Sequence, residues 1–331
     1  MSNHIIPVIK LDNISIHPNA DSLEIVQIFG YQCVVRKDQF HTNDLVAYIE
    51  PDYLIPVSEP EFSFLAPKAK EGFVRITAMR LSGENSFGLV IPARENWKEG
   101  DNVIEELGIK RYEPFIPGAN FIQTENEVSP NVYAVKYDME NYRRYNNIIQ
   151  IDEEVCITEK VNGASSRYVH TNNDDIHFHV GSHTCWKRRN PQNMWWKAAA
   201  QYDLENKLQK YPDHVFYGEL YGNVGGFRYG FKDNNIALAF FDIMYKGVWL
   251  DVPAVKLILD ELELPSVPVL YWGPWKEELI SMSDGQTTIP NANHIREGIV
   301  VKPIKERVDP SIGRVILKIV GMDYLEGKKK R

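Results

Sequence analysis

The sequence predicts an α+β protein built from two domains. Its 331 residues, 44% of them hydrophobic, can bury a sizeable core, and a chain of this length typically forms about two domains. Short strand-like segments dominate roughly the first hundred residues, whereas the later residues mix strand-like and helix-like segments. Residues 110–132, between them, are rich in Pro, Asn and Gly and have no steady period. We therefore expect a small all-β domain, a linker and a larger mixed domain.

The first domain contains four segments with the β-branched and aromatic residues typical of strands, separated by turn residues. They are residues 22–30 (SLEIVQIFG), 31–37 (YQCVVRK), 44–50 (DLVAYIE) and 73–81 (FVRITAMRL). Short strands at this spacing indicate a small β-barrel or sandwich. The preceding HPNAD is expected to be a turn, because Pro18 restricts φ and Asn19 and Asp21 can bond to their own backbone.

The second domain is expected to contain a hairpin, two helices and further strands. The hairpin joins residues 165–170 and 176–182 across the turn-rich TNNDD. Apolar spacing and alanine content predict one helix in residues 193–211, and a second is expected in residues 253–264, with a proline near its start. The further strands are expected in residues 214–222, 235–245, 297–303 and 314–320.

Composition excludes several classes of protein. A net charge of −8 argues against a protein that coats DNA or an anionic membrane over its whole surface, although local basic patches stay possible. The three cysteines are far apart and form no C-x-x-C pair, which argues against a disulfide framework and a zinc knuckle. No secretory signal and no long apolar run is present. We expect a cytoplasmic protein without a membrane partner.

Lys160, in the segment TEKVNG, is the first candidate for chemistry. A lysine amine has an ordinary pKa near 10.4, so it is nucleophilic at neutral pH only when it is desolvated or lies among other cations and a metal ion. Two later strand-like segments supply such cations, Lys302 and Lys318, in mostly apolar surroundings. Exposed strand edges also carry lysines, so each residue taken alone can equally be a solvated surface charge.

Two carboxylates, Glu219 in FYGELYG and Glu297 in EGIVVKP, are expected at the edge of buried structure. Partly buried carboxylates need partners. Magnesium takes oxygen ligands, keeps several waters and bridges substrate phosphates, so the two glutamates can hold divalent ions beside a nucleotide. Ion pairs with neighbouring lysines are the alternative.

In chain order, the segments TEKVNG, VFYGELYG, AFFDI, EGIVVKP and RVILKIV resemble the five nucleotidyltransferase motifs of ATP-dependent RNA ligases, in the branch of phage T4 RNA ligase 2. The ordered set is far more specific than any single segment, and it covers nearly the whole second domain. HPNADSLEI and the later MRLSGENSFGLVIP are similar to the OB-fold tRNA-binding modules of phenylalanyl-tRNA synthetase β chains. A fused N-terminal module of this kind characterises RNA ligases like those of Deinococcus and Naegleria.

The resemblance implies a fold and domain limits. We expect an OB-fold β-barrel that binds RNA in residues 1–115, a linker in residues 116–132, and an RNA ligase nucleotidyltransferase domain in residues 133–331. The second domain is then built on antiparallel sheets and is unrelated to the ATP-grasp fold. OB-folds commonly hold oligonucleotides on a strand face, so the first domain is a candidate clamp on the nicked strand or its template.

By position in the motifs, the resemblance implies that Lys160 attacks the α-phosphate of ATP, expels pyrophosphate and carries AMP covalently. The AMP then passes to an RNA 5′-phosphate, and a 3′-OH displaces it; all three steps are phosphoryl transfers. The catalytic residues are then Lys160, Glu219, Glu297 and Lys318, and the two glutamates hold Mg²⁺ or Mn²⁺ or contact the ribose. The residues expected around the nucleotide are Glu159, Asn162, Gly163, Phe241, Lys302 and Lys318. The Phe241 ring is expected to stack on the adenine, or else to belong to the core, and both lysines to contact the α-phosphate.

Three features depart from the family pattern. Asn162 stands where relatives carry histidine or aspartate, and an amide cannot take up a proton near neutral pH. Val320 stands where relatives usually carry a second lysine, two residues after Lys318. The phosphate-binding arginine of the hairpin that follows the first motif has three candidates here: His183, Arg188 and Arg189.

Histidines of the same hairpin raise the alternative of a zinc site. They are His170, His177, His179 and His183. No cysteine or carboxylate stands at firm ligand spacing beside them, so a solvent-facing hairpin is the favoured interpretation.

The function expected from the resemblance is an ATP-dependent RNA ligase that joins RNA 3′-OH and 5′-phosphate ends in RNA repair. Its expected substrate is a nicked duplex, and we expect a monomer. Two alternatives stay open: a ligase-like RNA- or tRNA-binding protein without activity, which the Val320 departure favours, and a guanylyltransferase that uses GTP.

Overall fold

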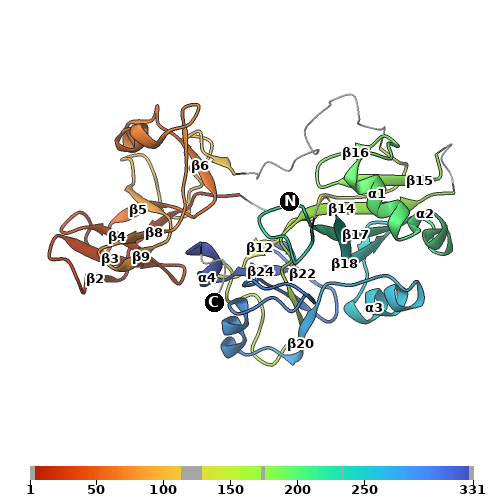
Figure 1. Cartoon of the computed structure of the whole chain (residues 1–331). Coiled ribbons are helices and arrows are strands. Elements are labelled where there is room, and N and C mark those ends of the chain that lie inside the picture. The colour runs from red at the N-terminus through yellow and green to blue at the C-terminus, as the bar shows by residue number, and fades with distance from the viewer. Residues whose placement is uncertain (1–3, 113–128, 173–175, 233–234, 328–331) are drawn as a thin grey trace. The chain divides into compact units, whose positions relative to one another are not determined.

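The computed structural model describes residues 4–112, 129–172, 176–232 and 235–327. The described chain divides into two compact units, one made of residues 4–112 with 325–327 and the other of residues 129–324 (Figure 1). Most of the expected linker, residues 116–132, lies outside the described residues. Within the part of the chain that the structure describes, no helix is long and apolar enough to cross a membrane.

The N-terminal unit is made of short antiparallel strands. In chain order these are β1 (Val8–Lys10), β2 (Ile14–Ile16), β3 (Leu23–Ile28), β4 (Tyr31–Arg36), β5 (Leu45–Ile49), β6 (Tyr53–Pro56), β7 (Phe73–Arg75), β8 (Met79–Leu81), β9 (Glu84–Ser86), β10 (Leu89–Pro92) and β11 (Lys110–Arg111). They pair in the orders β1-β5-β10, β11-β6-β7 and β2-β3-β4, and β8 pairs with β9. The 3-10 helix η1 (Pro60–Lys68) joins β6 to β7.

Three of the expected strands of this unit are confirmed as β3, β4 and β5. The fourth expected strand, residues 73–81, is divided, because its first half pairs with β6 as β7 and its second half pairs with β9 as β8. The expected turn before β3 is held by His17, which is 3% exposed. Its Nδ1 accepts from the Asn19 N–H at 3.1 Å, and its Nε2 lies 3.2 Å from the Leu81 carbonyl oxygen.

Two larger sheets form the second unit. The five-stranded sheet has the order β12 (Glu140–Asn141), β24 (Leu317–Val320), β21 (Gly298–Pro303), β13 (Glu154–Glu159) and β20 (Val269–Pro274). The six-stranded sheet has the order β16 (Trp186–Lys187), β15 (Phe178–Ser182), β14 (Ala164–His170), β17 (His214–Gly222), β18 (Ile236–Tyr245) and β19 (Val248–Trp249). A small ladder joins β22 (Val308–Asp309) to β23 (Gly313–Arg314). The expected antiparallel pattern holds except at β12, which pairs parallel with β24.

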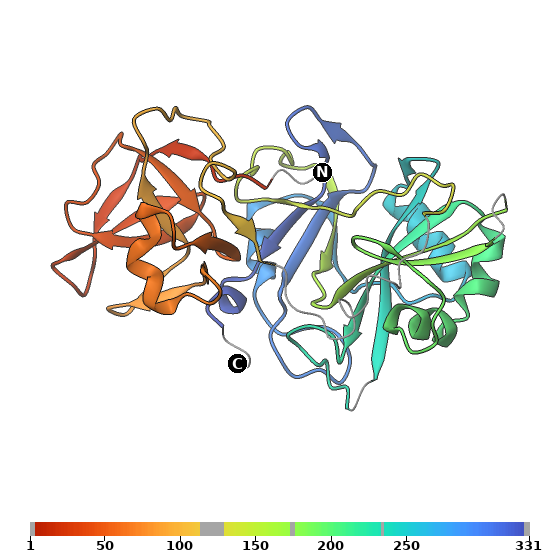
Figure 2. The same ribbon diagram turned by 90° about the horizontal axis from the view of Figure 1, so that it is seen from above.

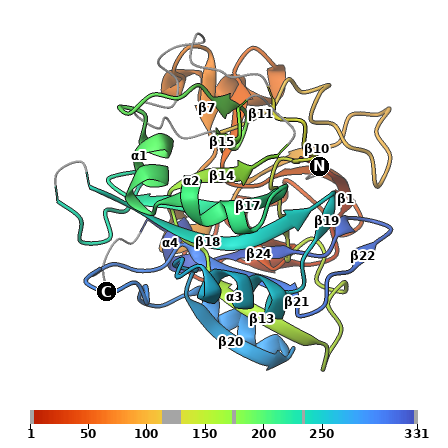
Figure 3. The same ribbon diagram turned by 90° about the vertical axis from the view of Figure 1, so that its right-hand side faces the viewer.

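Helices cover one face of the six-stranded sheet (Figure 3). They are α1 (Met194–Gln201), α2 (Leu204–Lys207) with the 3-10 turn η3 (Leu208–Lys210), and α3 (Val252–Glu261). The expected helix in residues 193–211 is broken, because Asp203 adopts a left-handed conformation with φ 53°. Asn193 caps α1 by accepting from the Trp195 N–H at 3.0 Å. Two further short helices are η4 (Glu277–Ser283) and α4 (Met322–Leu325).

Strand alternation separates a helix-covered face from a second face in the six-stranded sheet. Phe216 and Leu220 of β17 pack under the helices, so Tyr217 and Glu219 point to the other side. In the five-stranded sheet, Ile157 and its neighbours form a core on one face, which leaves Thr158 on the other. Figure 2 shows the two sheets as separate layers, the blue and yellow-green strands of one and the green to cyan strands of the other. Side chains from both layers line one pocket.

Candidate active site

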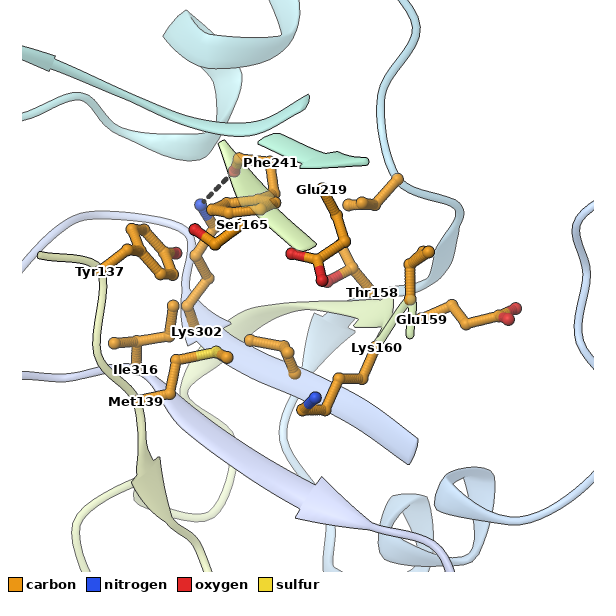
Figure 4. A pocket seen from close by; sticks show the side chains of 13 residues that line it. Tyr137, Met139, Thr158, Glu159, Lys160, Ser165, Glu219, Phe241, Lys302 and Ile316 are labelled. Atoms are coloured by element: carbon orange, nitrogen blue, oxygen red, sulfur yellow. Dashed lines mark hydrogen bonds between the residues drawn. The ribbon is translucent and has the colours of Figure 1, made fainter. Parts of the chain in front are cut away.

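One pocket of this unit lies where the two sheets face each other (Figure 4). The five-stranded sheet contributes residues of β13 and β21, and the six-stranded sheet contributes residues of β14, β17 and β18. The polar and aromatic side chains of its lining are Tyr137, Thr158, Glu159, Lys160, Ser165, Glu219, Phe241 and Lys302. The pocket therefore brings together expected site residues that lie up to 143 positions apart, Glu159 and Lys302 being the outermost.

Lys160 directly follows β13, and its N–H donates to the Gly298 carbonyl oxygen at 2.9 Å, which ties it to β21. Its side chain is 20% exposed, and its Nζ lies 2.5 Å from Glu297 Oε1. A lysine held in an ion pair inside a pocket is not a freely solvated surface charge. Its amine is presented to the space between the sheets, where a ligand can reach it.

Glu219 and Glu297 approach Lys160 from different sheets. Glu219 points from β17 into the pocket (Figure 4), whereas Glu297 directly precedes β21 and is 8% exposed. Burial raises the pKa of Glu219 to about 8; the charge of Lys160 offsets part of this effect, and the Glu297 carboxylate adds to it. The Glu297 carboxylate pairs with Lys160, and the charge of Lys160 also acts on the buried Glu219 carboxyl, so a further cation beside the two would stabilise the ionised form of Glu219.

Asn162 connects the lysine segment to its surroundings. Its Nδ2 donates to Glu297 Oε2 at 2.9 Å and its Oδ1 accepts from the Gly226 N–H at 2.8 Å. Its own N–H donates to the Tyr229 hydroxyl at 2.7 Å. Both ends of the amide are therefore used, and the amide can donate to the Glu297 carboxylate, which an ionised aspartate at this position could not do. Asn162, which departs from the family pattern, therefore makes three hydrogen bonds that connect the lysine segment to Glu297, Gly226 and Tyr229.

Gly163 lies where the chain after Lys160 passes β17. A Cβ at this position would collide with the Leu220 carbonyl group, so only glycine fits the close approach. The N–H of Gly163 bonds to Glu219 and lowers the pKa of that carboxyl in part. Gly163 therefore contributes backbone to the site.

Phe241 sits at a β-bulge. Asp242 pairs with Tyr217 and Phe240 pairs with Gly218, which leaves Phe241 as the extra residue of β18. Bulges redirect side chains next to functional sites. Here the bulge puts Phe241 and Asp242, although adjacent, on the pocket side of the sheet, while Phe240 stays under the helices. The Phe241 ring lines the pocket and contacts Tyr137, with 4.6 Å between ring centroids.

Lys302 is buried, and it faces the pocket from β21. Its Nζ lies 3.1 Å from Asp242 Oδ2 and donates to the Phe241 carbonyl oxygen at 3.1 Å (Figure 4). Asp242 Oδ2 also accepts from Arg314 at 2.6 Å and from the Tyr137 hydroxyl at 2.7 Å. Burial raises the pKa of Asp242, but Arg314 and Lys302 outweigh it, so the pKa stays below its usual value. This ion-pair group joins the two sheets beside the pocket.

Lys318 lies on β24, one strand further across the five-stranded sheet. It pairs with Val300, which in turn pairs with Thr158, and both of these residues line the pocket. Paired residues share a face, so the register places Lys318 on the pocket side. Lys160, Lys302 and Lys318 therefore all lie on one face of this sheet.

Glu159 lines the pocket, but its carboxylate points away from Glu219 and Phe241 (Figure 4). It is 1% exposed and accepts from the Thr288 N–H at 2.7 Å and from the hydroxyls of Thr287 and Thr288. These bonds hold the segment that leads to Glu297. The Glu159 carboxylate therefore accepts three hydrogen bonds from Thr287 and Thr288, and its role is to position this segment.

The hairpin candidates for a phosphate contact differ in their surroundings. Arg189 forms two bonds to Glu205, of 3.0 and 2.6 Å, on the surface. His183 Nε2 lies 3.8 Å from Asp138 Oδ1, and Arg188 is exposed. Among the described residues, no group of three or more His, Cys, Asp and Glu side chains is placed to hold a metal ion. The hairpin histidines are therefore not part of such a group within the described part of the hairpin.

Three residues in or beside the pocket were not predicted. Tyr137 precedes the first strand of its unit in a region with no periodic pattern, and Asp242 directly follows the predicted Phe241. Arg314 begins the segment RVILKIV, which was expected to be a single strand. In the structure Arg314 belongs to β23 and Lys318 to β24, so the position of Arg314 beside Asp242 could not be predicted from strand alternation. For Asp242, the signal was a carboxylate inside an otherwise apolar strand.

Comparison with known proteins agrees with this architecture. A family model described as RNA ligase matches residues 153–320, about half of the chain, and a model for an OB-fold domain matches residues 5–93. A search of the curated proteins found no match. The expected OB-fold and the expected ligase fold are both confirmed.

Solved structures of an RNA ligase from Naegleria gruberi are similar over nearly their whole length. A lysine variant with ATP and Mn is 23% identical with a TM-score of 0.82, covering 97% of this chain and 98% of that chain. The form with pyrophosphate is 24% identical with a TM-score of 0.83, covering 97% of each chain. A lysine variant with AMP and Mn is 24% identical with a TM-score of 0.82, covering 98% of this chain and 99% of that chain. At this identity the likeness shows the fold.

Proposed function

This chain belongs to the RNA ligase family, and we propose that it is an ATP-dependent RNA ligase in which Lys160 is the nucleophile. The observation that carries this proposal is the position of Lys160: its amine is paired with Glu297 in a pocket whose walls also carry Glu219, Phe241 and Lys302. Use of ATP is supported by the similar Naegleria gruberi ligase, which was solved with ATP and Mn.

In the first step, the neutral amine of Lys160 attacks the α-phosphorus of ATP. A P–N bond forms, the bond from that phosphorus to the bridging oxygen breaks, and pyrophosphate leaves with the electron pair. The proton of the amine must be lost, and the Glu297 carboxylate, 2.5 Å from Nζ, is in position to accept it. Lys302 and Lys318, on the same face of the sheet, supply positive charge for the phosphate oxygens.

Divalent ions fit the residues present. Glu297 pairs with Lys160, and Glu219 is a carboxyl whose pKa burial raises to about 8 while the charge of Lys160 lowers it in part, so a divalent ion beside both would stabilise the ionised form of Glu219. Mg²⁺ and Mn²⁺ prefer oxygen ligands, and one or two carboxylates with substrate phosphates are a usual set. When bound, such an ion stabilises the negative charge that develops on the phosphate oxygens and favours the neutral lysine amine.

The remaining steps transfer AMP to RNA and seal the strand. An oxygen of the RNA 5′-phosphate attacks the same phosphorus and releases Lys160, and the RNA 3′-oxygen then attacks the 5′-phosphorus and releases AMP, losing its proton. The bulge turns the Phe241 ring toward the pocket, and we assign to this ring the stacking on adenine. Asn162 and Gly163 border the nucleotide and orient the carboxylates; Glu159 acts by holding the segment before Glu297.

The domain roles follow from the same premise. Residues 133–331 are the ligase domain, residues 1–115 are an RNA-binding OB module, and residues 116–132 are the linker. The partner is RNA with 3′-OH and 5′-phosphate ends, and we propose a nicked duplex as the substrate. Action as a monomer, a cytoplasmic location and a role in RNA repair stay predictions.

The test is covalent labelling with α-³²P-ATP in the presence of Mg²⁺ or Mn²⁺. The wild-type chain is expected to acquire acid-labile, alkali-stable label, as a P–N bond requires. Lys160→Met and Lys160→Arg remove the nucleophile, the second while keeping the charge, and both are expected to show no label. Lys305→Met, at an exposed lysine outside the pocket, is the matched control and is expected to label as the wild type does.

Absence of label on the wild-type chain contradicts the proposal. If such a chain still binds nicked RNA, the binding-protein alternative is favoured. Label acquired from α-³²P-GTP, but not from α-³²P-ATP, identifies a guanylyltransferase instead.

A further inference from the structure

The sheet β11-β6-β7 of the N-terminal unit carries cations and aromatic rings on its outward face. Register places Lys110, Leu54 and Arg75 in one row across the three strands. Phe73 lies on the same face as Arg75, because it is two residues away on β7. The alternate residues of β6 are buried in the core of the unit. We call this outward face the cationic platform; it consists of Leu54, Phe73, Arg75, Lys110 and Tyr112.

Each cation of the platform lies over an aromatic ring. Lys110 Nζ is 4.6 Å from the Phe73 ring centroid, and Arg75 Cζ is 3.7 Å from the Tyr112 ring centroid. Both cations are exposed, whereas both rings are partly buried. Cation–π contacts of this kind contribute about 0.5–1 kcal/mol at exposed sites. The rings therefore limit the freedom of two surface cations, which reduces the entropy that an anionic ligand must remove on binding.

One carboxylate competes for the platform. Arg75 Nη2 lies 2.6 Å from Asp52 Oδ1, and the two side chains are 41% and 45% exposed. Exposed ion pairs contribute only about 0–1 kcal/mol, so a phosphate can take part in or displace this pair. The chain as a whole carries a net charge of −8, which repels polyanions. Arg75 and Lys110 form a local site at which this acidic protein can attract a polyanion.

We propose that the cationic platform binds the phosphodiester backbone of the RNA substrate without reading its bases. The identity of the polymer rests on the proposed function. A backbone fits better than unstacked bases, because the two cations already cover the ring faces on which bases would stack. The Arg75 guanidinium presents a planar set of donors that suits phosphate oxygens, and Lys110 adds a second point charge.

The test measures binding of a fluorescein-labelled nicked RNA duplex by anisotropy over a range of salt concentrations. Arg75→Gln and Lys110→Gln are each expected to weaken binding by about five- to tenfold near 0.1 M salt. Each variant is also expected to reduce the slope of log K against log salt by about 0.9, because one phosphate contact is lost. The double variant is expected to show both effects combined.

Three further variants separate this effect from loss of structure. Asp52→Asn removes the competing carboxylate and is expected to tighten binding by about two- to fivefold, a gain that misfolding cannot produce. Lys37→Gln, at an exposed lysine of the same unit that is not part of the platform, is the matched control and is expected to bind as the wild type does. Phe73→Leu keeps the apolar volume but removes the ring under Lys110, so it is expected to weaken binding less than Lys110→Gln does.

Adenylylation of Lys160 by ATP, without RNA, distinguishes this proposal from the proposed function. The platform variants are expected to label at the wild-type rate. Unchanged RNA affinity and salt slope in the double variant would overturn the platform, and so would a loss of adenylylation with RNA binding intact. A wild-type chain that binds RNA through the platform but takes no label overturns the proposed function alone.

Discussion

The side-chain amide of Asn162 donates to Glu297 Oε2 at 2.9 Å, while Lys160 occupies the other oxygen of the same carboxylate. The amide therefore orients the group that pairs with the nucleophile. A carboxylate at position 162 would repel Glu297, and it could not donate to it.

Replacement of Asn162 by aspartate is accordingly expected to slow adenylylation of Lys160. Hydrogen bonds to charged groups contribute about 1.5–3 kcal/mol, so we expect a rate lower by about ten- to a hundredfold. Asn162→Ala, which removes the donor but adds no charge, is expected to be less severe than Asn162→Asp. Pre-steady-state labelling measures the rate, and Asn13→Asp, at an exposed asparagine, is the charge-matched control. If Asn162→Asp and Asn162→Ala were adenylylated as fast as the Asn13→Asp control, Asn162 would have no positioning role.

The raised pKa of Glu219, about 8, predicts how the stability of the metal-free chain depends on pH. A group whose pKa is higher in the folded state than in the unfolded state stabilises the fold at low pH, and this contribution is lost as pH rises through the folded-state value. The melting temperature in EDTA is therefore expected to fall between about pH 5 and pH 8. Glu219→Gln is expected to flatten this decrease, and Mg²⁺ to offset it in the wild-type chain only. An identical pH profile for the variant contradicts the assignment.

The buried ion-pair group predicts a large effect on stability. Asp242 is 0% exposed and accepts from Lys302, Arg314 and Tyr137. Asp242→Asn leaves the buried Lys302 ammonium without its carboxylate and Arg314 with Glu306 alone, and breaking a buried ion pair typically costs about 3–5 kcal/mol. Urea denaturation measures the loss. Asp260→Asn, which breaks the exposed pair with Lys256, is the matched control and is expected to cost less than about 0.5 kcal/mol.

Glu159 is expected to hold the segment before Glu297 in place. Glu159→Ala removes the acceptor of three bonds from Thr287 and Thr288. We expect the Thr288 amide to exchange hydrogen at least about tenfold faster, since one bond to a carboxylate contributes about 1.5–3 kcal/mol. Hydrogen exchange with mass spectrometry measures this change. Glu154→Ala, at an exposed glutamate of the same strand, should leave that peptide unchanged; equal exchange in both variants would contradict the role.

Much of the fold followed from local patterns. The strands expected in residues 214–222 and 235–245 are β17 and β18, and the helix expected in residues 253–264 is α3. The helix expected in residues 193–211 was divided at Asp203, because its left-handed conformation depends on how the chain crosses the sheet. Residues 73–81 were divided because two different strands pair with the two halves, and pairing partners are not written in local sequence.

The order of motifs along the chain predicted that Lys160, Glu219, Phe241 and Lys302 belong to one site, and the pocket contains all four. Only the tertiary structure decided what each of them contacts. A bulge turned both Phe241 and Asp242 toward the pocket, which strand alternation cannot predict. The sequence by itself therefore determined the types of side chain and their order. The packing of two sheets decided their partners, because the bonds that hold this site join residues more than a hundred positions apart.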